Sequence, residues 1–417
     1  MAKNLKENSS KKAALDYHEF PQPGKLEIRA TKPLANQRDL SRAYSPGVAE
    51  ACLEIKEDEN TASKYTSKGN LVAVISNGTA VLGLGNIGPG ASKPVMEGKA
   101  VLFKKFANID CFDIEVDEDN PQRLAEIVSS LEPTFGAINL EDIKAPDCFE
   151  VERLCKEKMK IPVFHDDQHG TAIVVGAAAV NAIELSNRKI ENTKIVAVGA
   201  GASGIACLEM LVKLGAKREN IWLSDSKGLI TKNRSEINEE KKRFSQDSNL
   251  SKLDDVIKDC DMFLGLSGPG VLTSKMVLKM NKQPIIFALA NPDPEINPAD
   301  ALKVAPDALI ATGRSDYPNQ VNNVLCFPFI FRGALDVGAT QINDEMKLAC
   351  IHAIANLARQ TSTAETVEAY QGEILKFGKE YLIPKPFDPR LLPNVAVAVA
   401  EAAMKSGVAS RPLKDVE

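Results

Sequence analysis

The chain has 417 residues, of which 44% are hydrophobic and 26% charged, as expected for a globular protein with a large core. A net charge of −5 without a basic stripe argues against nucleic-acid binding, and no run of about 18 apolar residues could cross a membrane. The length favours two domains, and eight scattered cysteines behind a polar, lysine-rich start are typical of a cytoplasmic protein.

The first half of the chain predicts an α/β domain. Residues 1–40 are polar and interrupted by prolines, so we expect an arm that contains a short stretch of helix. From residue 71, short apolar runs alternate with helical patterns, which is typical of a parallel sheet. We expect strands at 71–75, 111–116 and 135–140, and helices at 93–107, 121–132 and 146–159.

A second alternating series begins near residue 160. We therefore expect one domain over residues 1–160 and a second domain, which ends in helices, over residues 161–417. The second series starts with the short strand IPVFH and a helix from Thr171. Further strands are expected at 194–198, 221–225, 261–267, 284–290 and 308–313, a loop at 226–250, and a helical tail from 343 with a break at 384–393.

The stretch GAGASG (199–204) fits the dinucleotide-binding pattern G-x-G-x-x-G, follows an expected strand and opens an expected helix. Gly199, Gly201, Ser203 and Gly204 would let a pyrophosphate approach the helix N-terminus. Asp225 ends the next strand, 21 positions after Gly204 (225 − 204), where an acid binds the adenosine ribose.

The choice between NAD and NADP stays open on these residues. Asp225 favours NAD because a carboxylate repels a 2′-phosphate. Lys227, Lys232 and Arg234 follow it closely, however, and any of them could neutralise that phosphate.

A second glycine-rich stretch, GLGNIG (83–88), is not expected to form another nucleotide fold. The residues PGASKP after it should delay any helix, which breaks the geometry of the pattern. We expect a loop that faces the cofactor from the other side of a cleft.

Two pairs of adjacent acids each follow an expected strand: Glu141 with Asp142, and Asp166 with Asp167. Since ligands bind beyond the carboxyl ends of parallel strands, both pairs should reach one crevice. Several converging carboxylates predict Mg²⁺ or Mn²⁺, whereas the spacing of cysteine and histidine does not suit zinc. The alternative is that each pair lies in a solvated loop. His165 and His169 are expected to orient carboxylates or to donate to the backbone.

Long motifs in this order resemble those of the malic enzymes, from about residue 20 to beyond residue 400. They are AYSPGVAEACLEI, GLGNIGPGASKPVMEGKAVLFK, NLEDIKAPDCFEVE, FHDDQHGTA, VGAGASG, FALANPDPEI and QVNNVLCFPFIFRGALD. The C-terminal SGVASRPLKDVE is similar to bacterial hybrid members, in which a phosphotransacetylase-like domain follows; such members are usually linked to NADP. The resemblance implies an α/β protein with an N-terminal malic-enzyme domain and a Rossmann-type, doubly wound parallel-sheet domain.

The resemblance also implies oxidative decarboxylation of (S)-malate to pyruvate and CO₂, with NADP (or NAD) and Mg²⁺ or Mn²⁺, in at least a homodimer whose N-terminal segment reaches a neighbouring subunit. Alternatives are a metal-assisted dehydrogenase of another hydroxy acid and an inactive nucleotide-sensing module. The resemblance implies Tyr44 as general acid and Lys99 as general base. It implies three metal ligands: Glu141, Asp142 and Asp167. The residues implied at the substrate are Asn291, Asn323 and Asp166, and Asn291 is also implied at the cofactor.

One departure concerns the substrate carboxylate. Eukaryotic malic enzymes carry an arginine just before GLG, whereas this sequence has Ala80 and Val81. We therefore expect Ser76, Asn77 and Thr79 to contribute to this contact.

Overall fold

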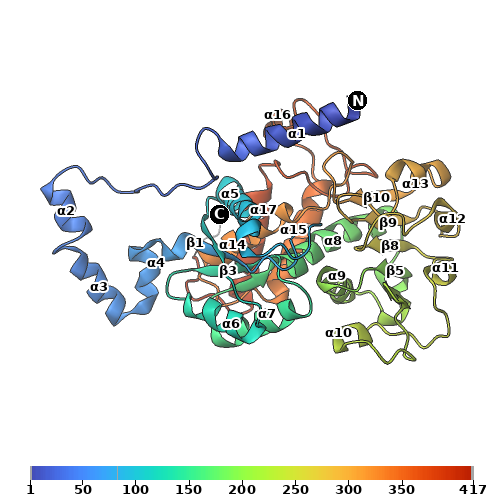
Figure 1. Ribbon diagram of the computed structural model, residues 1–417, viewed down its shortest axis with the longest axis horizontal. Helices are drawn as coiled ribbons and strands as arrows, with labels where there is room; N and C mark the ends of the chain where they lie inside the picture. The colour runs from blue at the N-terminus through green and yellow to red at the C-terminus, as the bar shows by residue number, and fades with distance from the viewer. Residues whose placement is uncertain (1, 82, 415–417) are drawn as a thin grey trace.

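The computed structural model describes residues 2–81 and 83–414, and it contains two sheets with helices packed around them (Figure 1). The first sheet is parallel, in the order β2-β1-β3-β4. Its strands are β1 (Leu71–Ser76), β2 (Asp110–Glu115), β3 (Ala137–Leu140) and β4 (Val163–His165), and its helices are α5 (Pro89–Ala107), α6 (Pro121–Ser130) and α7 (Asp147–Lys158). Ile75 pairs with Leu140, and Leu140 with His165, so the carboxyl ends of three strands meet at one edge.

The second sheet has the order β10-β9-β8-β5-β6-β7, in which only β7 is antiparallel. This order confirms the Rossmann-type α/β class. The strands are β5 (Ile195–Val198), β6 (Ile221–Asp225), β7 (Gly228–Leu229), β8 (Met262–Gly265), β9 (Ile285–Ala288) and β10 (Leu309–Thr312). The helices beside them are α9 (Ala202–Lys213), α10 (Glu239–Lys242), α11 (Leu253–Val256), α12 (Ser274–Val277) and α13 (Pro298–Val304), with short 3₁₀ turns at η3 (Ile190–Asn192) and η4 (Arg218–Asn220).

Two helix starts differ from expectation. α8 (Asp166–Leu185) begins at Asp166 rather than Thr171, so both acids lie in its first turn, where negative charge suits the helix dipole. α5 begins at Pro89, directly after Gly88, so the expected delay was wrong; proline fits a first helical turn. Residues 77–82 still separate β1 from GLGNIG, so no tight strand-to-helix turn forms there.

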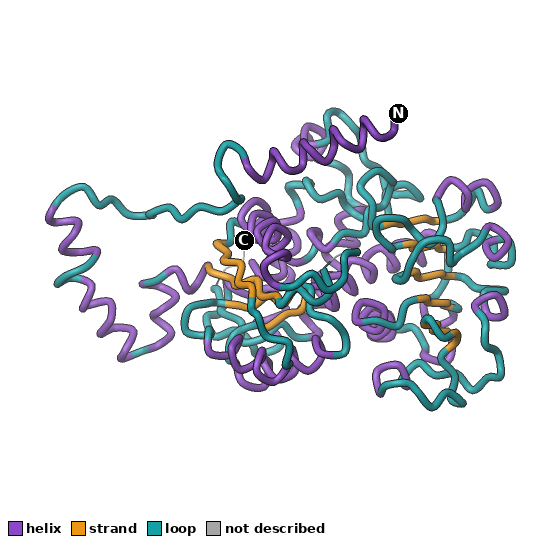
Figure 2. Tube along the Cα trace, in the orientation of Figure 1, coloured by secondary structure: helices purple, strands orange, loops and turns teal. Residues whose placement is uncertain are grey.

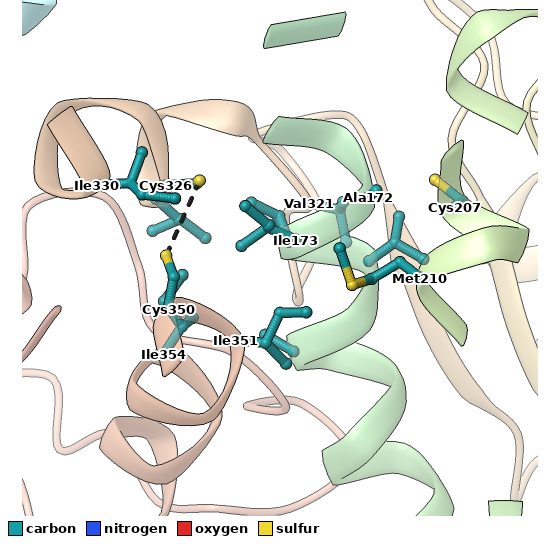
Figure 3. Packing of buried hydrophobic residues seen from close by; sticks show 14 of the residues in the cluster. Ala172, Ile173, Cys207, Met210, Val321, Cys326, Ile330, Cys350, Ile351 and Ile354 are labelled. Carbon is teal, nitrogen blue, oxygen red and sulfur yellow. Dashed lines mark hydrogen bonds between the residues drawn. The ribbon is translucent and has the colours of Figure 1, made fainter. Parts of the chain in front are cut away.

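Two of the C-terminal helices pack back onto α5 and α8 (Figure 1), and Figure 2 shows helices gathered around the strands of both sheets. The C-terminal helices are α14 (Phe327–Asp336), preceded by η5 (Asn323–Leu325), then α15 (Asp344–Arg359), α16 (Ala364–Ala369) and α17 (Leu391–Lys405). The ring centroid of Phe103 on α5 lies 4.7 Å from that of Phe327 and 5.2 Å from that of Phe331. Figure 3 shows side chains of α14 and α15 on one side of α8 and those of α9 on the other.

One hydrophobic core therefore joins strands and helices from both halves of the sequence. β4 completes the first sheet although it lies past residue 160. The division of the chain at residue 160 stays a prediction. In the described part of the chain, no helix is both long and apolar enough to cross a membrane.

The middle of the N-terminal segment projects from the body of the molecule (Figure 1). The segment consists of α1 (Ala2–Glu19), α2 (Gln37–Ala43), α3 (Val48–Glu57), η1 (Glu59–Thr61), α4 (Ala62–Tyr65) and η2 (Ser67–Asn70). α2 and α3 contain no buried residue and project from the rest of the chain (Figure 1). Leu40, Tyr44, Val48 and Leu53 are large hydrophobic side chains exposed on this segment, which we call the arm (residues 37–65).

Candidate active site

Three carboxylates converge at the carboxyl edge of the first sheet. Glu141 and Asp142 follow β3, Asp167 lies in the first turn of α8, and each offers an oxygen within 4.8 Å of the others. The backbone N–H of Asp142 donates to Asp167 Oδ2 at 2.8 Å, with Asp142 in the left-handed region at φ 52°. Hard oxygen donors this close suit Mg²⁺ or Mn²⁺, so these residues fit the expected metal.

The mutual repulsion of these acids shows in their pKa values. Burial, together with the charges of Asp167 and Asp166, raises the pKa of Glu141 to about 8. Burial, with the charges of Asp142 and Asp166, raises the pKa of Asp167 to about 7. Carboxylates that resist ionisation in each other's company are stabilised by a shared cation.

Lys99 reaches the same cluster from α5. Its Nζ lies 3.0 Å from Glu141 Oε1 and 2.5 Å from Asp166 Oδ2, and it stands 4.2 Å from the centroid of the Phe327 ring. Burial alone would lower the pKa of Lys99, but the charges of Asp166 and Glu141 raise it. In this arrangement Lys99 is an ammonium.

Asp166 is fully buried and shares Lys99 with Glu141. Its Oδ2 accepts from Lys99 and, at 2.8 Å, from Nδ2 of Asn323. Asn323 Oδ1 in turn accepts from the hydroxyl of Thr171 at 3.1 Å. These contacts place η5 against the first turn of α8.

The two histidines of FHDDQHG, His165 and His169, flank the acid pair in the sequence. Burial lowers the pKa of His165 to about 4 and that of His169 to about 3, so both rings are neutral. Neither ring nitrogen of His165 has a hydrogen-bond partner among the described residues, and its Nδ1 lies 3.8 Å from Asp167 Oδ2. His169 Nε2 lies 2.7 Å from Glu152 Oε1.

The glycine turn after β5 has the geometry that a dinucleotide requires. Gly199 has φ +108°, and a Cβ there would lie 2.2 Å from Leu266 O. A Cβ on Gly204 would lie 1.8 Å from Gly199 O, so this glycine allows close helix–strand packing. A Cβ on Gly201 would meet nothing within 4 Å, which leaves space for a pyrophosphate before the free N–H groups of α9.

A pocket of about 530 Å³ lies beside this turn, lined by Gly199, Gly201, Asp225, Ser226 and Lys241 among others. Arg234 binds Asp225 with both of its terminal nitrogens, at 2.9 and 3.2 Å, and Lys241 Nζ lies 2.9 Å away. Burial alone would raise the pKa of Asp225, yet these hydrogen bonds lower it to about 2.

Sequence reasoning had named Arg234 but missed Lys241. Of the other two candidate cations, Lys227 pairs with Glu236 and Lys232 with Asp247. Lys241 lies in α10, inside the stretch expected to be a loop. A helical i,i+4 charge pattern in NEEKKR was the only local signal, and it says nothing about Asp225.

One hydrogen bond joins the cofactor turn to the acids. Ser203 Oγ donates to the backbone carbonyl of Asp167 at 2.7 Å, which ties the first turn of α9 to that of α8. The loop of Gly83 also approaches from the first half of the chain, because a Cβ there would lie 3.4 Å from Asn291 O. Asn291 itself is exposed and follows β9.

The side chains expected to contact the substrate carboxylate, in place of the arginine of eukaryotic malic enzymes, form hydrogen bonds within the chain. Ser76 Oγ accepts from the N–H of Gly78, Asn77 Nδ2 donates to Glu118 O, and Thr79 Oγ1 donates to Asn77 Oδ1. All three are buried, and they hold the loop that follows β1.

Tyr44 is not brought to the site by its own chain. It ends α2 on the arm and is 72% exposed. The remaining residues of the expected set lie in the body, around the edges of the two sheets.

Comparison with known proteins agrees with this architecture. The family profile "Malic enzyme, N-terminal domain" matches residues 23–126, and "Malic enzyme, NAD binding domain" matches residues 168–370. The chain is 61% identical to the NADP-dependent malic enzyme of Haemophilus influenzae, over 97% of this chain and 54% of that protein. It is also 61% identical to an NAD-dependent malic enzyme of Rhizobium meliloti, over 97% of this chain and 53% of that protein. The chain thus spans about half the length of these two relatives.

The crystal structure of the malic enzyme from Pyrococcus horikoshii superposes with a TM-score of 0.89 at 42% identity, covering 97% of this chain and 93% of that one. Similarity of this extent, over a glycine turn and an acid cluster in matching folds, leaves one conclusion: the chain belongs to the malic enzyme family.

Proposed function

We propose that the chain oxidises (S)-malate and decarboxylates it to pyruvate and CO₂, with reduction of NADP. The observation that carries this proposal is the convergence of Glu141, Asp142, Asp167 and Lys99 beside the dinucleotide turn of α9. The names of the bacterial relatives, NADP-dependent and NAD-dependent malic enzymes, support it.

Glu141, Asp142 and Asp167 would hold Mg²⁺ or Mn²⁺. Such an ion would supply Lewis acidity, which stabilises the negative charge left when CO₂ departs. Asn323 and Asn291 are proposed to contact the substrate carboxylate or the nicotinamide amide. Because Asp166 gives its Oδ2 to Lys99 and Asn323, we assign it to holding Lys99 rather than to direct substrate contact.

Lys99 is proposed to take the proton of the C2 hydroxyl while a hydride passes from C2 to the nicotinamide. A lysine can do so only when neutral, and here Asp166 and Glu141 hold it protonated. A divalent cation held by Glu141 would offset one of these two negative charges, and the pKa of Lys99 would then be lower. The oxaloacetate formed loses its C4 carboxyl group as CO₂, and the electrons of the broken C3–C4 bond pass to the C2 oxygen, which leaves the enolate of pyruvate.

Tyr44 is proposed to protonate C3 of that enolate, which gives pyruvate, but from a second copy of the chain. The arm that carries Tyr44 buries nothing in its own chain and exposes Leu40, Val48 and Leu53. Exposed apolar side chains on one segment are typical of an interface, and paired arms give a closed, two-fold assembly. The working unit is therefore a homodimer in which each arm completes the partner's site.

The preference for NADP is proposed from the charges at the end of β6. Two cations, Arg234 and Lys241, face the single carboxylate of Asp225, so the rim of the pocket carries net positive charge. That charge suits a 2′-phosphate, which Arg and Lys bind well.

The test is an absorbance assay with malate, Mn²⁺ and either cofactor, in which pyruvate and CO₂ are measured alongside the reduced cofactor. We expect all three products in equal amounts and a higher kcat/KM with NADP. Reduced cofactor without CO₂ would assign a dehydrogenase of another hydroxy acid, and no reduction by the intact chain with metal would refute the function.

Lys99→Arg refines this test, because arginine stays charged at any working pH and cannot accept the proton. We expect kcat to fall about 10²–10⁴-fold, the usual contribution of general acid–base catalysis. Lys104→Met on the same helix, where Lys104 makes only an exposed pair with Asp110, is the control and should leave kcat unchanged.

A further inference from the structure

A buried polar network contacts the first turn of α8. It contains Glu152 of α7, His169 of α8 and Lys347 of α15. Glu152 is 7% and Lys347 6% exposed. Charges buried this deeply are costly unless they are paired, so their partners define what the network does.

Glu152 holds the start of α8 from both sides. Its Oε1 accepts from the backbone N–H of His165, the last residue of β4, at 3.3 Å. Its two oxygens lie 2.7 and 3.0 Å from Nε2 of His169. One carboxylate thus grips the residue before Asp166 and the residue two places after Asp167, so both acids lie in a turn that is fixed at each end.

Lys347 fixes the other side of the imidazole. Its Nζ lies 3.3 Å from Nδ1 of His169. An ammonium has only donors, so Nδ1 accepts, and the ring proton must lie on Nε2, where it is donated to Glu152. This assignment satisfies both ring nitrogens of a neutral histidine and permits one tautomer and one ring orientation.

The network continues into the surrounding helices. Lys156 Nζ lies 2.7 Å from Glu152 Oε1, and Asp344 lies 3.8 Å from Lys347 and 2.5 Å from Lys213 of α9. The His169 ring also packs against Phe164, with ring centroids 5.4 Å apart. Three helices, α7, α9 and α15, are therefore tied to the first turn of α8.

We propose that Lys347, His169 and Glu152 form a positioning network that sets the geometry of Asp167 as a metal ligand. Their hydrogen bonds within the described part of the chain join them to the backbone and the imidazole of this turn, so they act by fixing the turn that carries Asp167. Partners behind metal ligands of this kind change metal affinity by about 10–100-fold when removed. This inference rests on the proposed function, because it takes Asp167 as a ligand.

The test compares Lys347→Met with Arg359→Met, two substitutions that each remove one cation of α15 bonded to α8. Lys347 meets the first turn of α8, whereas Arg359 meets its far end, through Glu184 at 2.7 Å and Asn181 at 2.7 Å. Each variant is measured for its melting temperature, for its Kd for Mn²⁺ alone by titration calorimetry, and for its Kd for NADPH.

We expect Lys347→Met to raise the Kd for Mn²⁺ about tenfold with the NADPH Kd unchanged. Arg359→Met should lower the melting temperature without changing Mn²⁺ binding. Equal Mn²⁺ Kd values for wild type and Lys347→Met would overturn the inference, as would an equal loss of Mn²⁺ binding in both variants. If wild type binds no Mn²⁺, the proposed function fails as well; if wild type binds Mn²⁺ and oxidises malate, only the network is in question.

Two substitutions of His169 separate the halves of the network. Glutamine can present an N–H near the position of Nε2 and keep the bond to Glu152, whereas asparagine can serve Lys347 near the position of Nδ1 and loses Glu152. Because Glu152 grips both ends of the turn, His169→Gln should bind Mn²⁺ more tightly than His169→Asn. The reverse order would contradict the role assigned to Glu152.

Discussion

Recovery of activity on mixing two inactive variants tests directly whether Tyr44 of the arm acts in the site of a second copy. If Tyr44 of one copy serves Lys99 of the other, a pair made from Tyr44→Phe and Lys99→Met chains has one intact site and one site with both changes. Random pairing of equal amounts makes about half of the dimers mixed, so the mixture should recover about a quarter of the wild-type activity. Each variant alone should show only background rates.

The assay is the initial rate of NADPH formation after the two chains, which carry different affinity tags, are co-expressed. Purification through both tags isolates mixed dimers, whose specific activity should rise to about half of wild type. The control pairs Lys99→Met with Asp167→Asn, since both residues belong to the body of one chain and every site in that pair keeps a defect. Mixed dimers that form but stay inactive in the first pair would refute the exchange of Tyr44, as would equal recovery in the control.

Three further predictions concern the cofactor and the metal. Lys241→Ala should raise KM for NADP about 10–100-fold, the loss of one charge-assisted hydrogen bond of about 1.5–3 kcal/mol, and leave KM for NAD nearly unchanged; equal shifts would contradict a 2′-phosphate contact. Gly201→Ala should fold normally but bind NADPH poorly in a fluorescence titration. Gly204→Ala should lower the melting temperature, because its Cβ would lie 1.8 Å from a backbone oxygen. Similar behaviour of the two variants would contradict the separate roles assigned to these glycines. The raised pKa values of Glu141 and Asp167, about 8 and 7, keep these acids partly protonated near neutral pH. The affinity for Mn²⁺ should therefore rise with pH, and Mn²⁺ binding should release protons, which calorimetry in buffers of different ionisation enthalpy measures. An affinity that does not depend on pH would remove both acids from the ligand set.

The fold and the acid cluster could be predicted because each rests on a local rule. Alternating apolar runs predicted both sheets, and acids that follow parallel strands were expected to meet, as Glu141 and Asp167 do. The start of α8 was placed too late because DDQHG looks polar and contains a glycine. The structure gives Gly170 a reason: a Cβ there would lie 1.9 Å from Asp166 Oδ1.

Contacts between distant segments could not be predicted. Lys347 reaches His169 across 178 positions of sequence, and Lys241 reaches Asp225 from a short helix inside an expected loop. No pattern in either segment specifies its partner. The place of Tyr44 is harder still, since nothing in one chain says where a second chain lies.

The hydrogen bond from Ser203 to the carbonyl of Asp167 has a thermodynamic consequence. A nucleotide that orders the first turn of α9 also orders the backbone of Asp167, a residue proposed to bind metal. The loss of conformational entropy in this segment is then common to nucleotide binding and metal binding. By thermodynamic linkage the effect is reciprocal: the factor by which the dinucleotide raises the affinity for the ion equals the factor by which the ion raises the affinity for the dinucleotide. The order in which the two arrive then changes the route to the loaded enzyme and leaves its total free energy the same.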